Sequence, residues 1–284
     1  VTWHEVVRTC HGGSMSEIDL VVTDIDGTLW SHEGHIHDRV LRAWRSIESR
    51  GIPILVATGR RPRSTAVPLA AFGLAPPAVL LDGAIGIDLA TGHTFHERPI
   101  APGVGRSVLA RFRRHGLSPV VYVDSTAIDA YVGPDTSTNP GHLKRFGRHA
   151  CVADLDEVIE TETVLAFGLI GVPEAPLEAV AAAILADRLG EARINPSFDF
   201  GDCAFTVVAH GLSKWDGVLA FCAKSGIDAA RVLAIGDGSN DVELLAHAAL
   251  SFSLDGSSAL AVEAADHLVG SVSGGGWAEI LDFF

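Results

Sequence analysis

Short apolar runs alternate with segments of helical periodicity over the first third of the chain. Residues 18–23 are an apolar run that stops at an acidic turn, which is typical of a strand buried on both faces of a parallel sheet. Apolar residues then recur at helical spacing over 40–47, and another apolar run occupies 52–57. A helix over 64–72 and a strand over 78–81 continue this order. The alternation predicts a doubly wound parallel sheet of the α/β class.

The pattern changes after residue 82, where short strands bounded by turn residues become frequent. In this part we expect a hairpin over 84–97, helices over 102–115 and 176–189, and strands over 119–123, 127–132, 164–170, 192–196 and 205–208. The first pattern then returns, with helices over 213–224 and from 241, and strands over 232–236, 250–254 and 267–269. We therefore expect an α/β core from residues 15–82 and 208–284, interrupted by an inserted α+β cap domain at residues 83–207.

The first residues and the cysteines bear on where the folded part begins and where the protein resides. Residues 1–14 have no clear periodicity and precede Met15, the only methionine, so we expect a non-native or disordered extension. No run of about 18 apolar residues is present, and no membrane span is expected. The four cysteines are scattered without Cys-x-x-Cys spacing, which favours a reducing compartment, and we place the protein in the cytoplasm.

Net charge limits the classes of partner. The chain has 35 acidic and 21 basic residues, which gives a formal net charge of −14. Nucleic acids and anionic membranes bind positive surfaces, so we expect neither as a partner. A small phosphate ester can still bind if the site supplies a metal ion and a lysine, because local charges dominate at short range.

Two acidic turns follow predicted core strands. Asp24 and Asp26 follow the first strand, and Gly27 would allow backbone amides to approach a phosphate. An isolated Asp-x-Asp-Gly is common in ordinary turns, but a second acidic turn, 236–241, follows the strand over 232–236. Because the carboxyl ends of parallel strands share one crevice, three or four carboxylates are expected to converge there. Oxygen ligands favour Mg²⁺, and no matching His or Cys cluster suggests zinc.

Two further residues supply groups that phosphate chemistry needs. Thr58 offers a hydroxyl at the end of the second core strand, and Lys214 offers a cation near the start of the helix after the insertion. Either residue alone is more often a capping or solvated residue than part of a site.

Together these motifs resemble those of the haloacid dehalogenase superfamily of phosphatases. The matching motifs, in order, are Asp24-x-Asp26-Gly27-Thr28, Thr58-Gly59-Arg60, Lys214 and Gly236-Asp237-x-x-Asn240-Asp241. The insertion is similar to the larger α/β cap of the Cof-like, type II-B branch, so the resemblance covers the chain from about Met15 to its end. One departure is Asp82-Gly83-Ala84, where that branch usually has Asn-Gly-Ala.

The resemblance implies a Rossmann-like core and a role for each motif. Asp24 would be the nucleophile and Asp26 the general acid and base, whose backbone carbonyl also helps to hold Mg²⁺. The phosphate-binding and substrate-binding groups would come from Gly27, Thr58, Gly59, Arg60, Lys214 and Asn240. The metal would be held by Asp24, Asp26, Asp237 and Asp241. Arg60 is also expected to tie the core to the cap.

The resemblance also implies the reaction, hydrolysis of a small phosphate monoester by way of an aspartyl phosphate, with a sugar phosphate or similar metabolite as substrate. A sugar phosphomutase on the same fold and a non-catalytic ligand-binding regulator remain as alternatives. A Rossmann dehydrogenase does not fit, because Asp24-Ile25-Asp26-Gly27 stands where that fold requires Gly-x-Gly-x-x-Gly. The particular substrate and the oligomeric state are left open.

Overall fold

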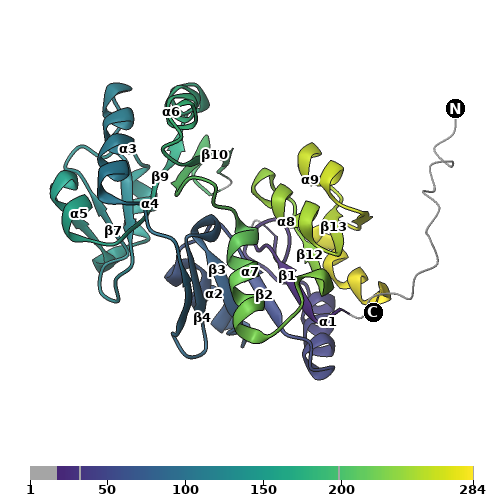
Figure 1. The fold of residues 1–284 in the computed structure, drawn as a ribbon. Helices are drawn as coiled ribbons and strands as arrows, with labels where there is room; N and C mark the ends of the chain where they lie inside the picture. The colour runs from purple at the N-terminus through teal and green to yellow at the C-terminus, as the bar shows by residue number, and fades with distance from the viewer. Residues whose placement is uncertain (1–17, 32, 198, 284) are drawn as a thin grey trace, which may run out of the picture.

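Two β-sheets, each covered by its own helices, organise the chain (Figure 1). The computed structural model describes residues 18–31, 33–197 and 199–283, so the extension predicted for residues 1–14 lies outside the described part. The larger sheet is built from both ends of the described chain, and the smaller sheet is built from the segment between them. None of the helices described is long and apolar enough to cross a membrane.

The larger sheet has eight strands in the order β14-β13-β12-β1-β2-β3-β4-β5. They are β1 (Leu20–Thr23), β2 (Ile54–Ala57), β3 (Pro77–Leu80), β4 (Ile85–Asp88), β5 (Thr94–Glu97), β12 (Val232–Ile235), β13 (Leu250–Leu254) and β14 (His267–Val269). The pairings from β14 to β3 are all parallel. This confirms the predicted parallel core.

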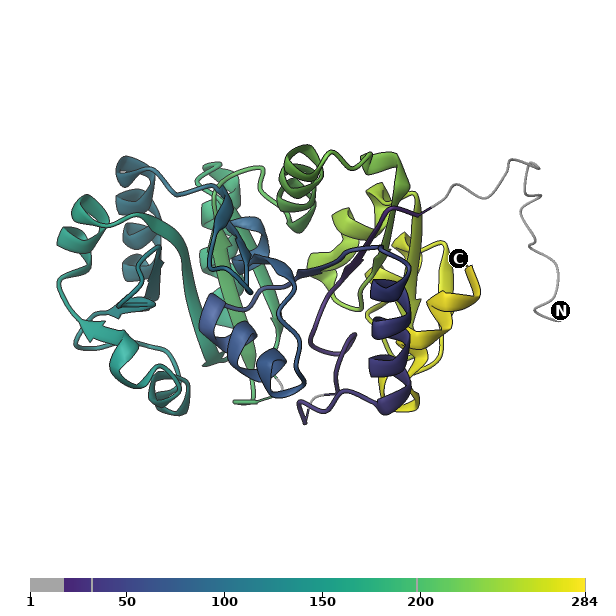
Figure 2. The same cartoon turned by 90° about the horizontal axis from the view of Figure 1, so that it is seen from below.

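Helices cover both faces of this sheet (Figure 2). One face packs against α1 (Asp38–Ser49), α2 (Pro62–Ala71) and the C-terminal 3₁₀ helix η6 (Gly276–Phe283), and the other packs against α7 (Lys214–Ser225), α8 (Val242–His247) and α9 (Ala259–Ala264). The central strand explains the need for both layers, because Val21 contributes to one cluster while Leu20 and Val22 contribute to the other. The sheet is therefore doubly wound, as predicted.

The β4–β5 hairpin belongs to the larger sheet, and our placement of residues 84–97 in the insertion is wrong. β4 pairs antiparallel with β3, from Pro77 opposite Asp88 to Leu80 opposite Ile85. The reversal occurs in the 3₁₀ turn η1 (Leu81–Gly83), where Leu81 and Asp82 both have positive φ, 49° and 52°. The sequence does not signal such a tight reversal, because Leu rarely adopts this conformation.

The smaller sheet has six strands in the order β10-β11-β9-β6-β7-β8. They are β6 (Val120–Val123), β7 (Ala130–Val132), β8 (Ala150–Val152), β9 (Val164–Val172), β10 (Glu191–Pro196) and β11 (Cys203–Val208). One face packs against α3 (Pro102–Arg114), α5 (Leu155–Thr161) and α6 (Glu174–Ala186) in a core of its own. The short elements α4 (Pro140–Lys144), α5, β8 and α9 were not predicted, because each is too brief to display a period.

The two sheets are joined at two places in the chain. The first is the segment between β5 and α3, and the second is the segment between β11 and α7. In Figure 1 the smaller sheet and its helices lie to one side of the larger sheet, with β10 directed toward the region of α8 and α9. We call the smaller sheet and its helices the cap. Its strand β10 lies beside the loop that follows core strand β12, since the Ser239 hydroxyl donates to Asn195 Oδ1.

Candidate active site

The predicted site residues lie at the ends of three adjacent core strands. Asp24 follows β1 directly, Thr58 follows β2 directly, and Asp237 comes two residues after β12. Because β1 pairs in parallel with both β2 and β12, these three strands end at the same edge of the sheet. The topology therefore brings together residues from distant parts of the chain.

Lys214 is a buried cation at the centre of this group. It is 1% exposed, and its Nζ donates to Asp24 Oδ1 at 2.8 Å and to Asp241 Oδ1 at 2.7 Å. The position of Lys214 is fixed because α7 begins at this residue, after a capping box in which Asp216 accepts hydrogen bonds from the Ser213 backbone and hydroxyl. One lysine thereby bridges two of the predicted carboxylates.

Three carboxylates form a compact group beside this lysine. One oxygen from each of Asp24, Asp237 and Asp241 lies within 4.8 Å of the others, and the Thr28 hydroxyl donates to Asp237 at 2.5 Å. Burial raises the pKa of Asp24 well above its usual value despite the opposing charge of Lys214, and burial together with Asp241 raises the pKa of Asp237 to about 7. The negative charge here exceeds what one lysine can balance, and the all-oxygen donor set fits a divalent cation such as Mg²⁺.

The loop after β12 has its shape because Asp241 accepts backbone hydrogen bonds. Its Oδ2 accepts from the amides of Asp237 and Gly238, at 3.1 and 2.9 Å, while its Oδ1 binds Lys214. Gly27 lies against the same loop with φ of 79°, and a Cβ there would lie 2.4 Å from Asp237 Oδ2. A larger residue than glycine at position 27 would therefore displace the Asp237 carboxylate.

The Asp26 side chain is bound by Arg60 and lies outside the three-carboxylate group. Arg60 Nε donates to Asp26 Oδ2 at 2.5 Å and Nη2 donates to Oδ1 at 2.6 Å, while Trp30 Nε1 donates to Oδ1 at 2.9 Å. Although burial works in the opposite direction, these bonds and the Arg60 charge lower the pKa of Asp26. The predicted use of the Asp26 backbone carbonyl as a metal ligand stays a prediction.

Thr58 and Asn240 border the site. Thr58 is 1% exposed, and its hydroxyl accepts from the Arg60 amide at 3.3 Å. Asn240 Nδ2 donates to Asp82 Oδ1 at 2.8 Å, and a Cβ at Gly59 would lie 3.1 Å from that same oxygen. Asp82 is 2% exposed, so the residue that departs from the usual Asn-Gly-Ala is a buried carboxylate in contact with the site.

Among the described residues, Arg61 and Arg63, and not Arg60, make ion pairs to the cap. Both guanidinium groups pair with the buried carboxylate of Asp129, with Arg63 Nε at 2.9 Å. Arg61 also lies 4.1 Å from the centre of the Phe146 ring. The expectation that Arg60 ties the core to the cap is therefore wrong, because the Arg60 side chain pairs with Asp26 and the contacts to the cap come from its two neighbours.

Three residues with contacts at or near the site were not predicted from the sequence: Thr28, Trp30 and Asp129. Of these, only Thr28 lies in a recognised motif.

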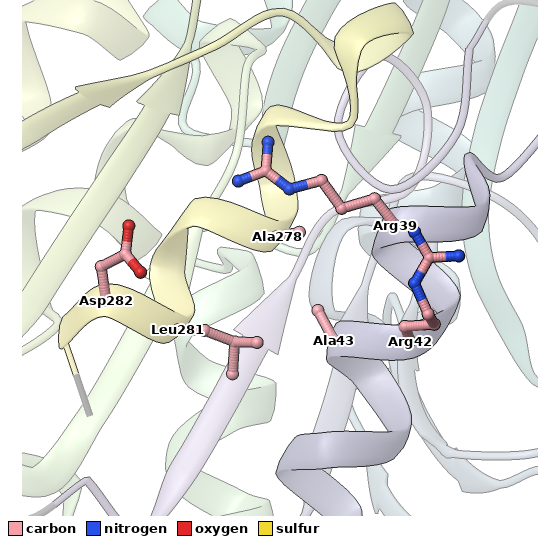
Figure 3. Close-up of a pocket in the computed structure, with 6 residues that line it drawn as sticks. All are labelled: Arg39, Arg42, Ala43, Ala278, Leu281 and Asp282. Carbon is pink, nitrogen blue, oxygen red and sulfur yellow. The ribbon is translucent and has the colours of Figure 1, made fainter.

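A groove of about 270 Å³ lies between α1 and the C-terminal helix η6 (Figure 3). Its lining residues are Arg39, Arg42, Ala43, Ala278, Leu281 and Asp282. None of them belongs to the predicted motifs, so this groove is separate from the site built around Asp24.

Comparison with protein families decides the assignment. The model of the haloacid dehalogenase-like hydrolases matches residues 21–281, which is nearly the whole described chain. The chain belongs to this family. The family and the enzyme class that the motifs predicted are thereby confirmed.

Known members give the level of similarity. The chain is 27% identical to a phosphoglycolate phosphatase of Methanopyrus kandleri, over 81% of this chain and 82% of the relative. It is 28% identical to a phosphoglycolate phosphatase of Halobacterium salinarum, over 92% of this chain and 95% of the relative. A solved subclass IIB sugar phosphatase of this superfamily matches with a TM-score of 0.74 and 22% identity, over 93% of this chain and 98% of the other. A haloacid dehalogenase-like hydrolase from B. subtilis matches with a TM-score of 0.77 and 16% identity, over 93% of this chain and 99% of the other. The structural matches support the fold, and the cap is included in the match.

Proposed function

We propose that this protein is a magnesium-dependent phosphatase that hydrolyses a small phosphate monoester through an aspartyl phosphate on Asp24. The observation that carries this proposal is the position of Asp24, which shares the buried Lys214 with Asp241 and lies in a group of three carboxylates. The lysine holds one Asp24 oxygen, and a nucleophile held in this way needs little reorganisation before attack.

Attack and hydrolysis form two steps in this proposal. In the first, an Asp24 oxygen forms a bond to phosphorus as the bond to the leaving oxygen breaks, and Asp26 donates a proton to that oxygen. In the second, Asp26 takes a proton from water, which attacks the phosphoryl group and releases phosphate and free Asp24. The phosphoryl oxygens are bound by Thr58, Lys214 and the backbone near Gly27 and Gly59, and Asn240 orients them.

Asp24, Asp237 and Asp241 would hold Mg²⁺, together with the backbone carbonyl of Asp26. When bound, the ion would supply positive charge that offsets the repulsion between the Asp24 carboxylate and the phosphate. Asp241 has a second task, because it also holds Lys214 and the backbone of its own loop. Its removal would therefore disturb the lysine as well as the ion.

The relatives indicate which substrates to test first. Two relatives are phosphoglycolate phosphatases and one structural neighbour is a sugar phosphatase, so phosphoglycolate and sugar phosphates are the first compounds to test. The experiment measures free phosphate release in the presence of Mg²⁺ and in the presence of a chelator.

A sugar phosphomutase would instead return the phosphoryl group to the sugar, giving an isomeric sugar phosphate with no free phosphate. Mg²⁺-independent ligand binding without turnover would support a regulator.

Magnesium affinity is expected to weaken as the pH falls. The pKa of Asp237 is raised to about 7, so below that pH its carboxyl is largely protonated and the ion must displace a proton. Between pH 8 and pH 6 the dissociation constant should rise about 10-fold for one released proton. Isothermal titration with MgCl₂ at both pH values checks this. Asp237→Asn, which cannot take up that proton, should bind Mg²⁺ more weakly and with a smaller pH dependence, the remainder coming from Asp24, whose pKa is also raised.

Arg60→Gln is expected to move the acidic limb of the kcat profile to higher pH. Arg60 lowers the pKa of Asp26, so its removal raises that pKa and the basic form of Asp26 appears only at higher pH. The direction of the shift is fixed because loss of a close positive charge disfavours the ionised carboxylate. Arg42→Gln, an exposed arginine of α1, serves as the control. An unchanged profile in Arg60→Gln would remove Asp26 from the proton-transfer role.

A further inference from the structure

Strand β10 of the cap has one face directed at the core domain. Ala192 and Ile194 pack into the hydrophobic core of the cap, so the alternate side chains point the other way. Among these, Glu191 accepts from the Gly211 amide at 2.7 Å, Arg193 Nη2 donates to the Leu212 carbonyl at 2.8 Å, and Asn195 Oδ1 accepts from the Ser239 hydroxyl at 2.8 Å. This face therefore contacts the core along its whole length.

Two of these contacts place β10 across the proposed active site. Leu212, the partner of Arg193, lies two residues before Lys214, and Ser239, the partner of Asn195, lies between Asp237 and Asp241. Two residues of a strand span only about 6.6 Å. The section from Arg193 to Asn195 therefore bridges the segment that leads to Lys214 and the loop that carries Asp237 and Asp241, so side chains on this face lie beside the proposed site.

Arg193 differs from the other cations around this crevice. Among the described residues, the paired cations are Lys214 with Asp24 and Asp241, Arg60 with Asp26, Arg61 and Arg63 with Asp129, and Arg145 with Asp199. Arg193 makes no carboxylate contact in the described part of the chain, and its Nη1 is buried without a hydrogen-bond partner. Leaving a buried donor of a charged group without a partner costs free energy, and a ligand that accepts a hydrogen bond from it would remove that cost.

We propose that Arg193 binds an oxyanion on the leaving group of the substrate, so that the preferred esters carry a carboxylate or a second phosphate besides the phosphate that is cleaved. A guanidinium matches either group with two parallel N–H···O bonds. Asn195 and Leu212 hold β10 over the site, while Arg193 supplies the charge. This rests on the proposed phosphatase function and adds a substrate class to it.

The test compares matched esters. 2-Phosphoglycolate and ethyl phosphate differ in a carboxylate, and fructose 1,6-bisphosphate and fructose 6-phosphate differ in a second phosphate. For at least one pair, Arg193→Gln should lower the selectivity, the ratio of the two kcat/KM values, about 10- to 100-fold, which corresponds to the loss of a charged hydrogen-bond pair. The selectivity of Arg193→Lys should lie between that of the wild type and that of Arg193→Gln. The pair that responds tells whether the oxyanion is a carboxylate or a phosphate. Arg113→Gln, an exposed cap arginine paired with Asp156, is the control.

Binding measurements separate this inference from the catalytic proposal. Calorimetry of 2-phosphoglycolate and fructose 1,6-bisphosphate with Asp24→Asn, with and without Arg193→Gln, should show at least a 10-fold weaker affinity in the double variant for the preferred ester. This result is independent of turnover. Equal selectivity in wild type and Arg193→Gln, or equal affinity in the binding experiment, overturns the role of Arg193. Failure of the wild type to release phosphate from every ester contradicts the proposed function alone.

Discussion

Asp24→Asn is expected to abolish magnesium-dependent phosphate release while the melting temperature stays the same or rises. Activity is lost because an amide is too weak a nucleophile to form the aspartyl phosphate. Stability is kept because burial raises the pKa of Asp24, so its ionised form opposes folding at neutral pH. The sign follows from linkage: a carboxyl that binds its proton more tightly in the folded state loses stability as the pH rises, and the neutral Asn avoids that loss.

The measurement pairs phosphate release with thermal unfolding at pH 7.5. Asp156→Asn, an exposed carboxylate of the cap, is the matched control and should keep full activity. Phosphate release by Asp24→Asn near the wild-type rate would contradict the nucleophile assignment. A large fall in its melting temperature would contradict the stated cause of the raised pKa.

Lys214→Met is expected to destabilise the protein and to abolish activity. Methionine fills a similar volume, but Asp24 and Asp241 lose the cation that both contact. Removing one partner from a buried ionic group costs about 3–5 kcal/mol, which corresponds to a fall in melting temperature of roughly 10 °C. The loss should grow as the pH rises from 6 to 8, since unpaired carboxyls must then ionise within the folded protein.

Lys224→Met in the same helix is the control for this variant. Lys224 is exposed in the last turn of α7 and lies far along the helix from Lys214, so its replacement should change the free energy of unfolding by less than about 1 kcal/mol. Denaturant unfolding at pH 6 and pH 8 measures both variants. Equal stability of Lys214→Met and Lys224→Met would show that the buried lysine does not balance the carboxylates.

The core and the grouping of site residues could be predicted because they depend on local patterns. Apolar runs that end in polar turns locate the parallel strands, and strands that run parallel must end at one edge. The strand-end rule predicts that Asp24, Asp237 and Asp241 share one crevice, and the family resemblance adds Lys214. In the structure the three carboxylates lie together, and Lys214 Nζ contacts Asp24 at 2.8 Å and Asp241 at 2.7 Å.

The details that escaped prediction depend on side-chain orientation and on long-range pairing. Arg60 turns to Asp26, and the ion pairs to the cap come from Arg61 and Arg63, a choice among three nearby arginines that periodicity does not resolve. The hairpin after η1 was assigned to the wrong sheet because two consecutive positive-φ residues, Leu81 and Asp82, reverse the chain. Hairpin signals indicate two paired strands but not the sheet that they join.

The buried state of the site was also beyond the sequence. Asp24 is 6% exposed and Lys214 is 1% exposed, although charged residues near strand ends are usually solvated. Lys214 is buried at the first position of the helix α7, which covers one face of the sheet, and its Nζ contacts the buried carboxylates of Asp24 and Asp241. The perturbed pKa values of Asp24 and Asp237 follow from this burial, and so does the expectation that a divalent cation completes the site.

The central claim is that Asp24 becomes phosphorylated, and rapid acid quenching during turnover tests it most directly. Protein quenched within the first turnovers of an ester found to be hydrolysed is digested and analysed by peptide mass spectrometry. The account predicts a phosphoryl adduct on the peptide that contains Asp24, dependent on Mg²⁺ and absent from Asp24→Asn. Continued phosphate release with an adduct on another residue would contradict it.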